Sequence, residues 1–226
     1  MELLALSFII ITALTIIVFY LAVGRDKRIL GALALWTAVV GWSAYGGFFE
    51  NTSTIPPRIL LLLLPLVVLM IVLYRQIAVA RTNLLLLTAV HIVRISVELI
   101  LYGLYLREKI PVGMTYAGWN FDIVVGISAI PLLIYWFWKS PNPTLLRGWN
   151  YFGLAMLSII IVTAILSTPG PLQQMAFEQP NVAILTYPFT LLPGVVVPLV
   201  ALSHLLSLKK IGYQSGTVPT ADAARR

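Results

Sequence analysis

The chain has 226 residues, of which 60% are hydrophobic and only 10% are charged, and its mean hydropathy is +0.95. A soluble domain of this size could not bury so much apolar surface, so the composition indicates an integral membrane protein. There is no cysteine, which excludes disulfides, thiolate metal sites and a cysteine nucleophile. The net charge of +7 comes from short basic clusters between apolar runs, a pattern that indicates membrane topology and not nucleic-acid binding.

The N-terminal stretch MELLALSFIIITALTIIVFYLAVGRDKR predicts a first spanning helix that is retained. It carries Glu2 where a secretory signal peptide has a positive segment. Its apolar run is about 20 residues long, whereas the apolar core of a signal peptide has roughly 7 to 15.

A transmembrane helix needs about 20 mostly apolar residues. Seven segments of the chain meet or approach that length, at 3–23, 29–49, 59–79, 84–106, 121–138, 151–167 and 183–208. We therefore predict an all-α integral membrane protein, a seven-transmembrane-helix bundle formed by residues 1–208. The remaining residues, 209–226, are polar and rich in small side chains, which predicts a disordered cytoplasmic tail.

The basic residues predict the orientation of the bundle, because Lys and Arg are enriched on the cytoplasmic side of membrane proteins. With the N-terminus outside, eleven of the 15 basic residues fall on the cytoplasmic side, three fall outside, and Arg94 lies within the membrane. Adding or removing one span would destroy this partition. We therefore expect the N-terminus outside and the C-terminus in the cytoplasm.

The fourth span contains HIVRISVELI, in which ionisable residues recur at helical spacing. His91, Arg94, Glu98 and Tyr102 fall on one helix face, and this face must point into the bundle because charge at membrane depth is costly. One interpretation is a structural ion pair between Arg94 and Glu98, four residues apart. Apolar residues often stabilise a core as well as a buried ion pair does, so the pattern favours a functional site.

The fifth span begins with TYAGWNFD, which supplies Trp119, Asn120 and Asp122. At about 1.5 Å per residue, Asp122 and Glu98 are both expected in the outer half of the bundle. Two carboxylates can hold Arg94 in a hydrogen-bonded clamp, for which a small anionic ligand could compete. Asp122 is also a candidate N-cap of its helix.

The seventh span contains TYPFTLLPGVVVP, with prolines at 188, 193 and 198. Each proline removes a backbone donor and frees a carbonyl about four residues earlier, so this helix must bend or partly unwind. It is either an ordinary kinked helix or a hinge of the kind found in transporters. Tyr187 is expected on the same aqueous side as Asp122.

Catalytic and metal-binding motifs are absent from the sequence. His91 and His204 are predicted at depths that need not match, with His204 at the interface, so neither a haem nor any other cofactor is expected. The usual zinc site needs three protein ligands, and two histidines away from the carboxylates make a poor set. We therefore predict no metal site.

The run from HIVRISVELILYGLY to GMTYAGWNFDIVVG resembles stretches of an uncharacterised family of bacterial multi-helix inner-membrane proteins. The likeness covers mainly the fourth and fifth spans. It implies a multi-pass protein of the bacterial inner (plasma) membrane and brings no known activity.

The leading functional hypothesis is a small-molecule binding, transport or sensor-like membrane protein with an outward-facing polar cavity built on the fourth, fifth and seventh spans. The alternatives are an intramembrane enzyme acting on a lipid or isoprenoid, and a scaffold or partner subunit whose buried charges are structural. Membrane lipids and a small anionic ligand are the expected partners, and nucleic acid is not. The candidate ligand-binding residues are His91, Arg94, Glu98, Tyr102, Trp119, Asn120, Asp122 and Tyr187.

Overall fold

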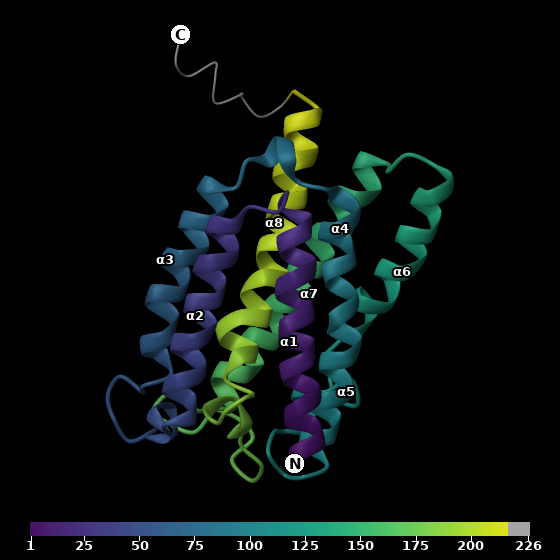
Figure 1. The fold of residues 1–226 in the computed structure, drawn as a ribbon. Coiled ribbons are helices and arrows are strands. Elements are labelled where there is room, and N and C mark those ends of the chain that lie inside the picture. The colour runs from purple at the N-terminus through teal and green to yellow at the C-terminus, as the bar shows by residue number, and fades with distance from the viewer. Residues whose placement is uncertain (217–226) are drawn as a thin grey trace.

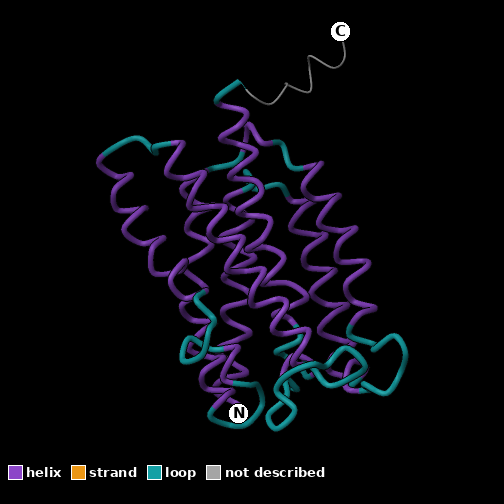
Figure 2. Tube along the Cα trace, turned by 180° about the vertical axis from the view of Figure 1, so that it is seen from behind, coloured by secondary structure: helices purple, strands orange, loops and turns teal. Residues whose placement is uncertain are grey.

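The computed structural model describes residues 1–216, which fold into seven long helices running up and down a bundle (Figure 1). The helices are α1 (Glu2–Ala22), α2 (Lys27–Tyr45), α3 (Leu60–Gln76), α4 (Leu84–Ala89) with α5 (Val93–Tyr105), α6 (Asp122–Trp138), α7 (Pro143–Ser167) and α8 (Val197–Gln214). Helices α4 and α5 form one rod, because the 3₁₀ turn Val90–Ile92 joins them without a break. Figure 2 shows helices and loops but no strand in the described part of the chain.

Five of these helices are long and apolar enough to cross a membrane, and α3 and α6 are shorter apolar helices. The chain is therefore a multi-pass membrane protein. Its first residue and the end of α8 lie at opposite ends of the bundle (Figure 1).

Helix α8 occupies the centre of the bundle and packs against α7, α4 and α3. Helices α2 and α3 lie on one side of it, and α6 leans away from the bundle on the other side (Figure 1). The main apolar core runs along α1, α5 and α8, where Phe8, Leu104 and Leu199 are almost completely buried. This packing places the polar faces of α5, α6, α7 and α8 toward one another.

Helix α7 starts eight residues before the predicted span, at Pro143 instead of residue 151. Asn142 is its N-cap, with Oδ1 accepting hydrogen bonds from the backbone amides of Thr144 and Leu145 at 2.9 and 3.2 Å. Proline is favoured at the first helical position because its missing N–H would have no partner there. The turn before residue 151 is thus helical despite its charged Arg147.

The seventh predicted span, 183–208, is only partly a regular helix. Residues Ala183–Leu185 form a 3₁₀ turn, Leu192–Val196 form a π turn, and α8 follows from Val197. Pro198 has no N–H to donate to the carbonyl of Gly194, and this carbonyl instead accepts the indole N–H of Trp36 at 2.8 Å. The unwinding predicted from the prolines is present as this π turn.

Helix α8 continues to Gln214, beyond the predicted boundary at residue 208. Its lysines explain the extension, because Lys209 donates to the carbonyl of Tyr74 at 2.8 Å and Lys210 donates to that of Ala80 at 2.9 Å. These bonds satisfy backbone groups at and just beyond the end of α3. This corrects the predicted start of the disordered tail, and the rest of that tail, 217–226, lies outside the described residues.

Candidate functional site

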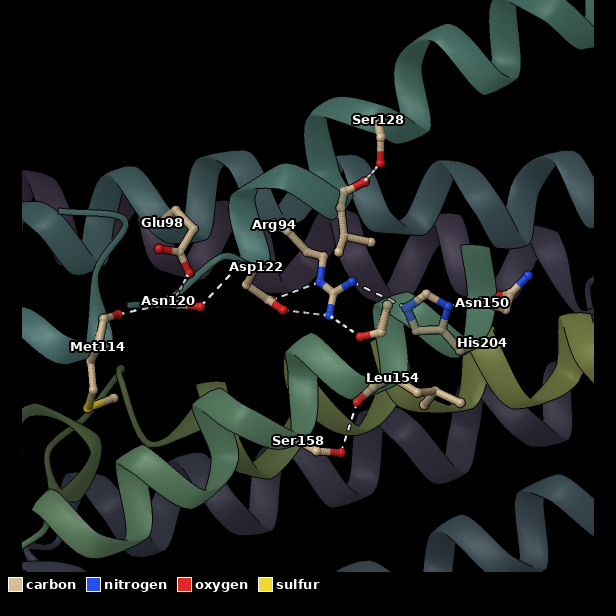
Figure 3. Close-up of polar contacts among 12 residues, drawn as sticks. Arg94, Glu98, Met114, Asn120, Asp122, Ser128, Asn150, Leu154, Ser158 and His204 are labelled. Atoms are coloured by element: carbon tan, nitrogen blue, oxygen red, sulfur yellow. Dashed lines mark hydrogen bonds and ion pairs between the residues drawn. The ribbon is translucent and has the colours of Figure 1, made fainter. Parts of the chain in front are cut away.

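Arg94 on α5 and Asp122 at the start of α6 form a two-pronged ion pair inside the bundle (Figure 3). Arg94 Nε donates to Asp122 Oδ2 at 2.8 Å, and Nη2 donates to Oδ1 at 2.7 Å. Asp122 is the first residue of α6, and Phe121 holds the N-cap position without a side-chain bond. Asp122 therefore binds the arginine and does not cap the helix. The ion pair predicted between Arg94 and Glu98, four residues apart, is not formed.

The same guanidinium reaches α7 and α8. Arg94 Nη1 lies 3.2 Å from Nε2 of His204, and Nη2 donates to the carbonyl of Gly153 at 3.3 Å. The other ring nitrogen of His204 lies 2.8 Å from Oδ1 of Asn150, whose amide nitrogen donates to the carbonyl of Leu146. One arginine thus connects four helices through its donors, and only 2% of its surface is exposed.

His91 completes this end of the site. Its ring stacks on that of His204, with the centroids 3.8 Å apart and the planes 26° from parallel, and Trp149 packs edge-on to it at 5.1 Å. The predicted interfacial position of His204 is therefore wrong, because both histidines are fully buried at one level.

At the other end, Glu98 on α5 meets the loop that precedes α6. Glu98 Oε1 accepts a hydrogen bond from Asn120 Nδ2, which also donates to the carbonyl of Met114 at 3.1 Å. Asn120 Oδ1 accepts the backbone N–H of Asp122 at 3.1 Å. Glu98 Oε2 is buried and makes no hydrogen bond of ordinary geometry, although the backbone of Tyr116 interacts with the carboxyl group.

Figure 3 shows the row of polar side chains from Glu98 to Asn150; together with His91, which stacks on His204, they form what we call the buried polar network. Its members are His91, Arg94, Glu98, Asn120, Asp122, Asn150 and His204. All seven side chains are at least nine-tenths buried. The network joins α5, α6, α7 and α8 within the bundle, and ionisable residues inside membrane-spanning helices are costly to bury, which makes the network a candidate site.

Three predicted site residues lie outside the network. Trp119 is half exposed and donates its indole N–H to the hydroxyl of Thr163 at 3.3 Å. Tyr102 packs on the ring of Tyr116, with centroids 5.0 Å apart. Tyr187 lies edge-on to Tyr45 at 6.0 Å on the far side of the bundle, beside α2.

The outward-facing polar cavity predicted from the sequence is not found at these residues. The two pockets described below are not lined by Arg94, Glu98, Asn120 or Asp122. The charged groups contact one another directly, which fills the space that a ligand would need.

One pocket is an apolar groove of about 230 Å³ between α3, α7 and α8. Every side chain that lines this α3–α7–α8 groove is apolar except that of Thr168. Leu66 and Met70 of α3, Ala164 of α7 and Ala201 of α8 line its length, and Leu101 and Met114 also contribute. The second pocket is a wider depression of about 670 Å³ between α1 and α2, lined by Trp42, Tyr45 and Tyr187.

Sequence reasoning missed Asn150, Gly153 and the position of His204. A signal was present, because Leu146, Asn150, Gly153 and Leu157 recur at spacings of three and four residues and form a buried face of α7. A Cβ at Gly153 would overlap the His204 ring, so glycine lets α8 approach α7 closely. Among the described residues, no group of three His, Cys, Asp or Glu side chains could hold a metal ion.

The profile of a family described as "Domain of unknown function (DUF8737)" matches residues 56–211. The match covers well over half of the chain, from the loop before α3 into α8, and includes the whole buried polar network. The protein therefore belongs to this family. No curated protein and no solved structure matches the chain.

Proposed function

We propose that this protein is a small-molecule-binding membrane protein, of the transporter or sensor kind, and that its ligand carries a hydrocarbon chain. The observation that supports this best is the α3–α7–α8 groove. Its lining is apolar. Both α7 and the segment Leu192–Gln214, which contains α8, are long enough to span a bilayer. The volume of about 230 Å³ lies below the roughly 300–1,000 Å³ typical of drug-sized ligands, which favours one slender chain.

The groove and the buried polar network share structural parts. Met114 lines the groove with its side chain, while its carbonyl accepts a hydrogen bond from Asn120 of the network. Pro193 and Pro198 also line the groove. They belong to the continuous helical segment Leu192–Gln214, which also carries His204. A hydrocarbon chain that enters the groove would displace Met114 or the helical segment that carries His204. Either movement would change the contacts of Arg94.

The π turn supports this coupling between the groove and the buried polar network. π turns inside helices occur frequently at functional sites, and this one ends beside the groove. Its Gly194 carbonyl is held by Trp36 of α2, and a Cβ at Gly194 would lie 2.9 Å from a methyl group of Val40. A shift of the π turn would therefore move α2 relative to α8.

For the orientation, we propose that the N-terminus is outside and that the membrane is the bacterial inner membrane. The loops 23–26, 77–83 and 139–142 lie at the end of the bundle where α8 finishes (Figure 1). They carry Arg25, Arg81 and Lys139, and Lys209 and Lys210 lie at the same end. This accumulation of basic residues supports a cytoplasmic position for that end.

Native mass spectrometry of the protein released from lipid nanodiscs tests the proposed function. We expect wild-type protein to retain one tightly bound phospholipid, and Ala164→Phe, which fills the groove, to lose it. Ala155→Phe is the matched control, because Ala155 is an exposed residue of the same helix outside the groove. Equal lipid retention by both variants, with normal gel-filtration profiles, would contradict the proposal.

A further inference from the structure

The buried polar network contains more acid than base. Arg94 is its one cation and already donates two hydrogen bonds to Asp122, so this pair is electrically balanced. Glu98 is the second carboxylate, and the only ion pair among residues 1–216 is Arg94–Asp122. If Glu98 were ionised, it would be an unbalanced charge at membrane depth.

The surroundings of Glu98 offer little to an ionised carboxylate. Only 1% of the residue is exposed, and Oε1 accepts a hydrogen bond from the neutral amide of Asn120. The backbone of Tyr116 also interacts with the carboxyl group, so both polar contacts come from neutral groups and not from a cation. Asn120 cannot turn to help, because both ends of its amide are held by Met114 and Asp122. Burying a charge without a partner is far more costly than burying a neutral polar group.

The charged neighbours of Glu98 are Arg94 on its own helix and Asp122 on α6, which oppose each other. The turn Val90–Ile92 contributes only His91, and the segment before α6 contributes the neutral backbone of Tyr116. Helix α1 packs along α5, but its titratable side chains are Glu2 and Tyr20, near its two ends. No further cation among the described residues faces the carboxyl group.

We propose that Glu98 is a proton-binding site in the membrane interior and that it holds a proton in this structure. Releasing the proton to water leaves a carboxylate that attracts Arg94 and repels Asp122. The ionised form therefore competes with Asp122 for the arginine, and Arg94 is also the residue that reaches His204 on α8. Proton binding at Glu98 would then select between two arrangements of the network, whether or not the groove holds a ligand.

Infrared spectroscopy of the full chain in lipid nanodiscs tests this site, because a protonated carboxyl group has its own C=O stretching band. Glutamate labelled with ¹³C at the carboxyl carbon should shift that band in wild-type protein at neutral pH. Glu98 is the only buried one of the five glutamates, so the label reports on it without any substitution. The band should disappear when the pH is raised.

Glu98→Gln should abolish the labelled band, whereas Glu178→Gln, at an exposed position, should leave it unchanged. If Glu98→Gln does not fold, the labelled wild-type protein still decides the question. The absence of a glutamate C=O band at neutral pH would overturn the proposal. A band that persists in folded Glu98→Gln would overturn it as well.

Discussion

Arg94 and Asp122 are separated by 28 positions in the sequence, yet two parallel hydrogen bonds of 2.8 and 2.7 Å join their side chains. This geometry is the strongest form of an arginine–carboxylate contact, because the planar guanidinium meets both oxygens at once. The contact ties α5 to α6 in a region that excludes water. Both side chains are at least nine-tenths buried, so each depends on the other for its charge balance.

Removing Arg94 alone should therefore be more damaging than removing both partners. Arg94→Met alone leaves Asp122 as a buried carboxylate without its cation and should lower the free energy of unfolding by about 3–5 kcal/mol. Asp122→Leu should cost less, because Glu98 can release its proton and pair with Arg94. The double variant of Arg94→Met with Asp122→Leu should lose less than Arg94→Met alone. Chemical unfolding in mixed micelles measures these differences, with exposed Arg107→Met as the control. Losses that simply add in the double variant would contradict the pairing.

Gly153 should be essential for the approach of α7 to α8. A methyl group at Gly153 would overlap the His204 ring, so Gly153→Ala should lower the free energy of unfolding by about 1–3 kcal/mol. It should also displace His204 from Arg94. Gly148 is the matched control on α7, because a Cβ there meets nothing within 4 Å. Thermal unfolding followed by circular dichroism measures both, and equal behaviour of the two variants would refute the close contact.

Trp36 should stabilise α8 only as long as Pro198 leaves the Gly194 carbonyl without its usual donor. Trp36→Phe removes the indole N–H and should lower the free energy of unfolding by about 1–3 kcal/mol. In a Pro198→Ala background the new backbone N–H can donate to this carbonyl, so the same substitution should be less costly. A double-mutant cycle of unfolding free energies measures the difference. An identical cost in both backgrounds would argue against this role of the tryptophan.

The proposed orientation can be tested with single cysteines, since the natural chain has none. Ser53→Cys, in the loop before α3, should react with a membrane-impermeant maleimide added to intact cells. Ser140→Cys, between α6 and α7, should react only after the membrane is opened. Both serines are exposed, so burial does not explain a difference. The reverse labelling pattern would invert the proposed topology.

Much of the helical architecture could be predicted from the sequence, because an apolar run of membrane-spanning length has few alternatives to a helix. The first five predicted spans match helices to within a few residues. The sixth was predicted too short, since hydropathy does not detect an N-cap such as Asn142. The seventh was predicted as one helix, although its first part forms turns around Pro188.

The sequence predicted which residues of the candidate site share one face of the fourth span. It did not predict which residues of different helices contact one another. The spacing of His91, Arg94 and Glu98 indicated the buried face of the fourth span. The partner of Arg94 depended on which groups α6, α7 and α8 bring to it, and that is decided by packing. Small residues such as Gly153 determine this packing, and they do so through the space they leave free.

Photolabelling tests most directly whether the α3–α7–α8 groove holds a hydrocarbon chain. A fatty acid with a diazirine in its chain should label the groove segments 160–168 and 192–201 of wild-type protein in nanodiscs. Ala164→Phe should reduce that labelling about ten-fold, equivalent to ~1.4 kcal/mol of lost contact, while Ala155→Phe should not. Labelling spread evenly over the exposed faces of all helices, and unchanged by Ala164→Phe, would contradict the account.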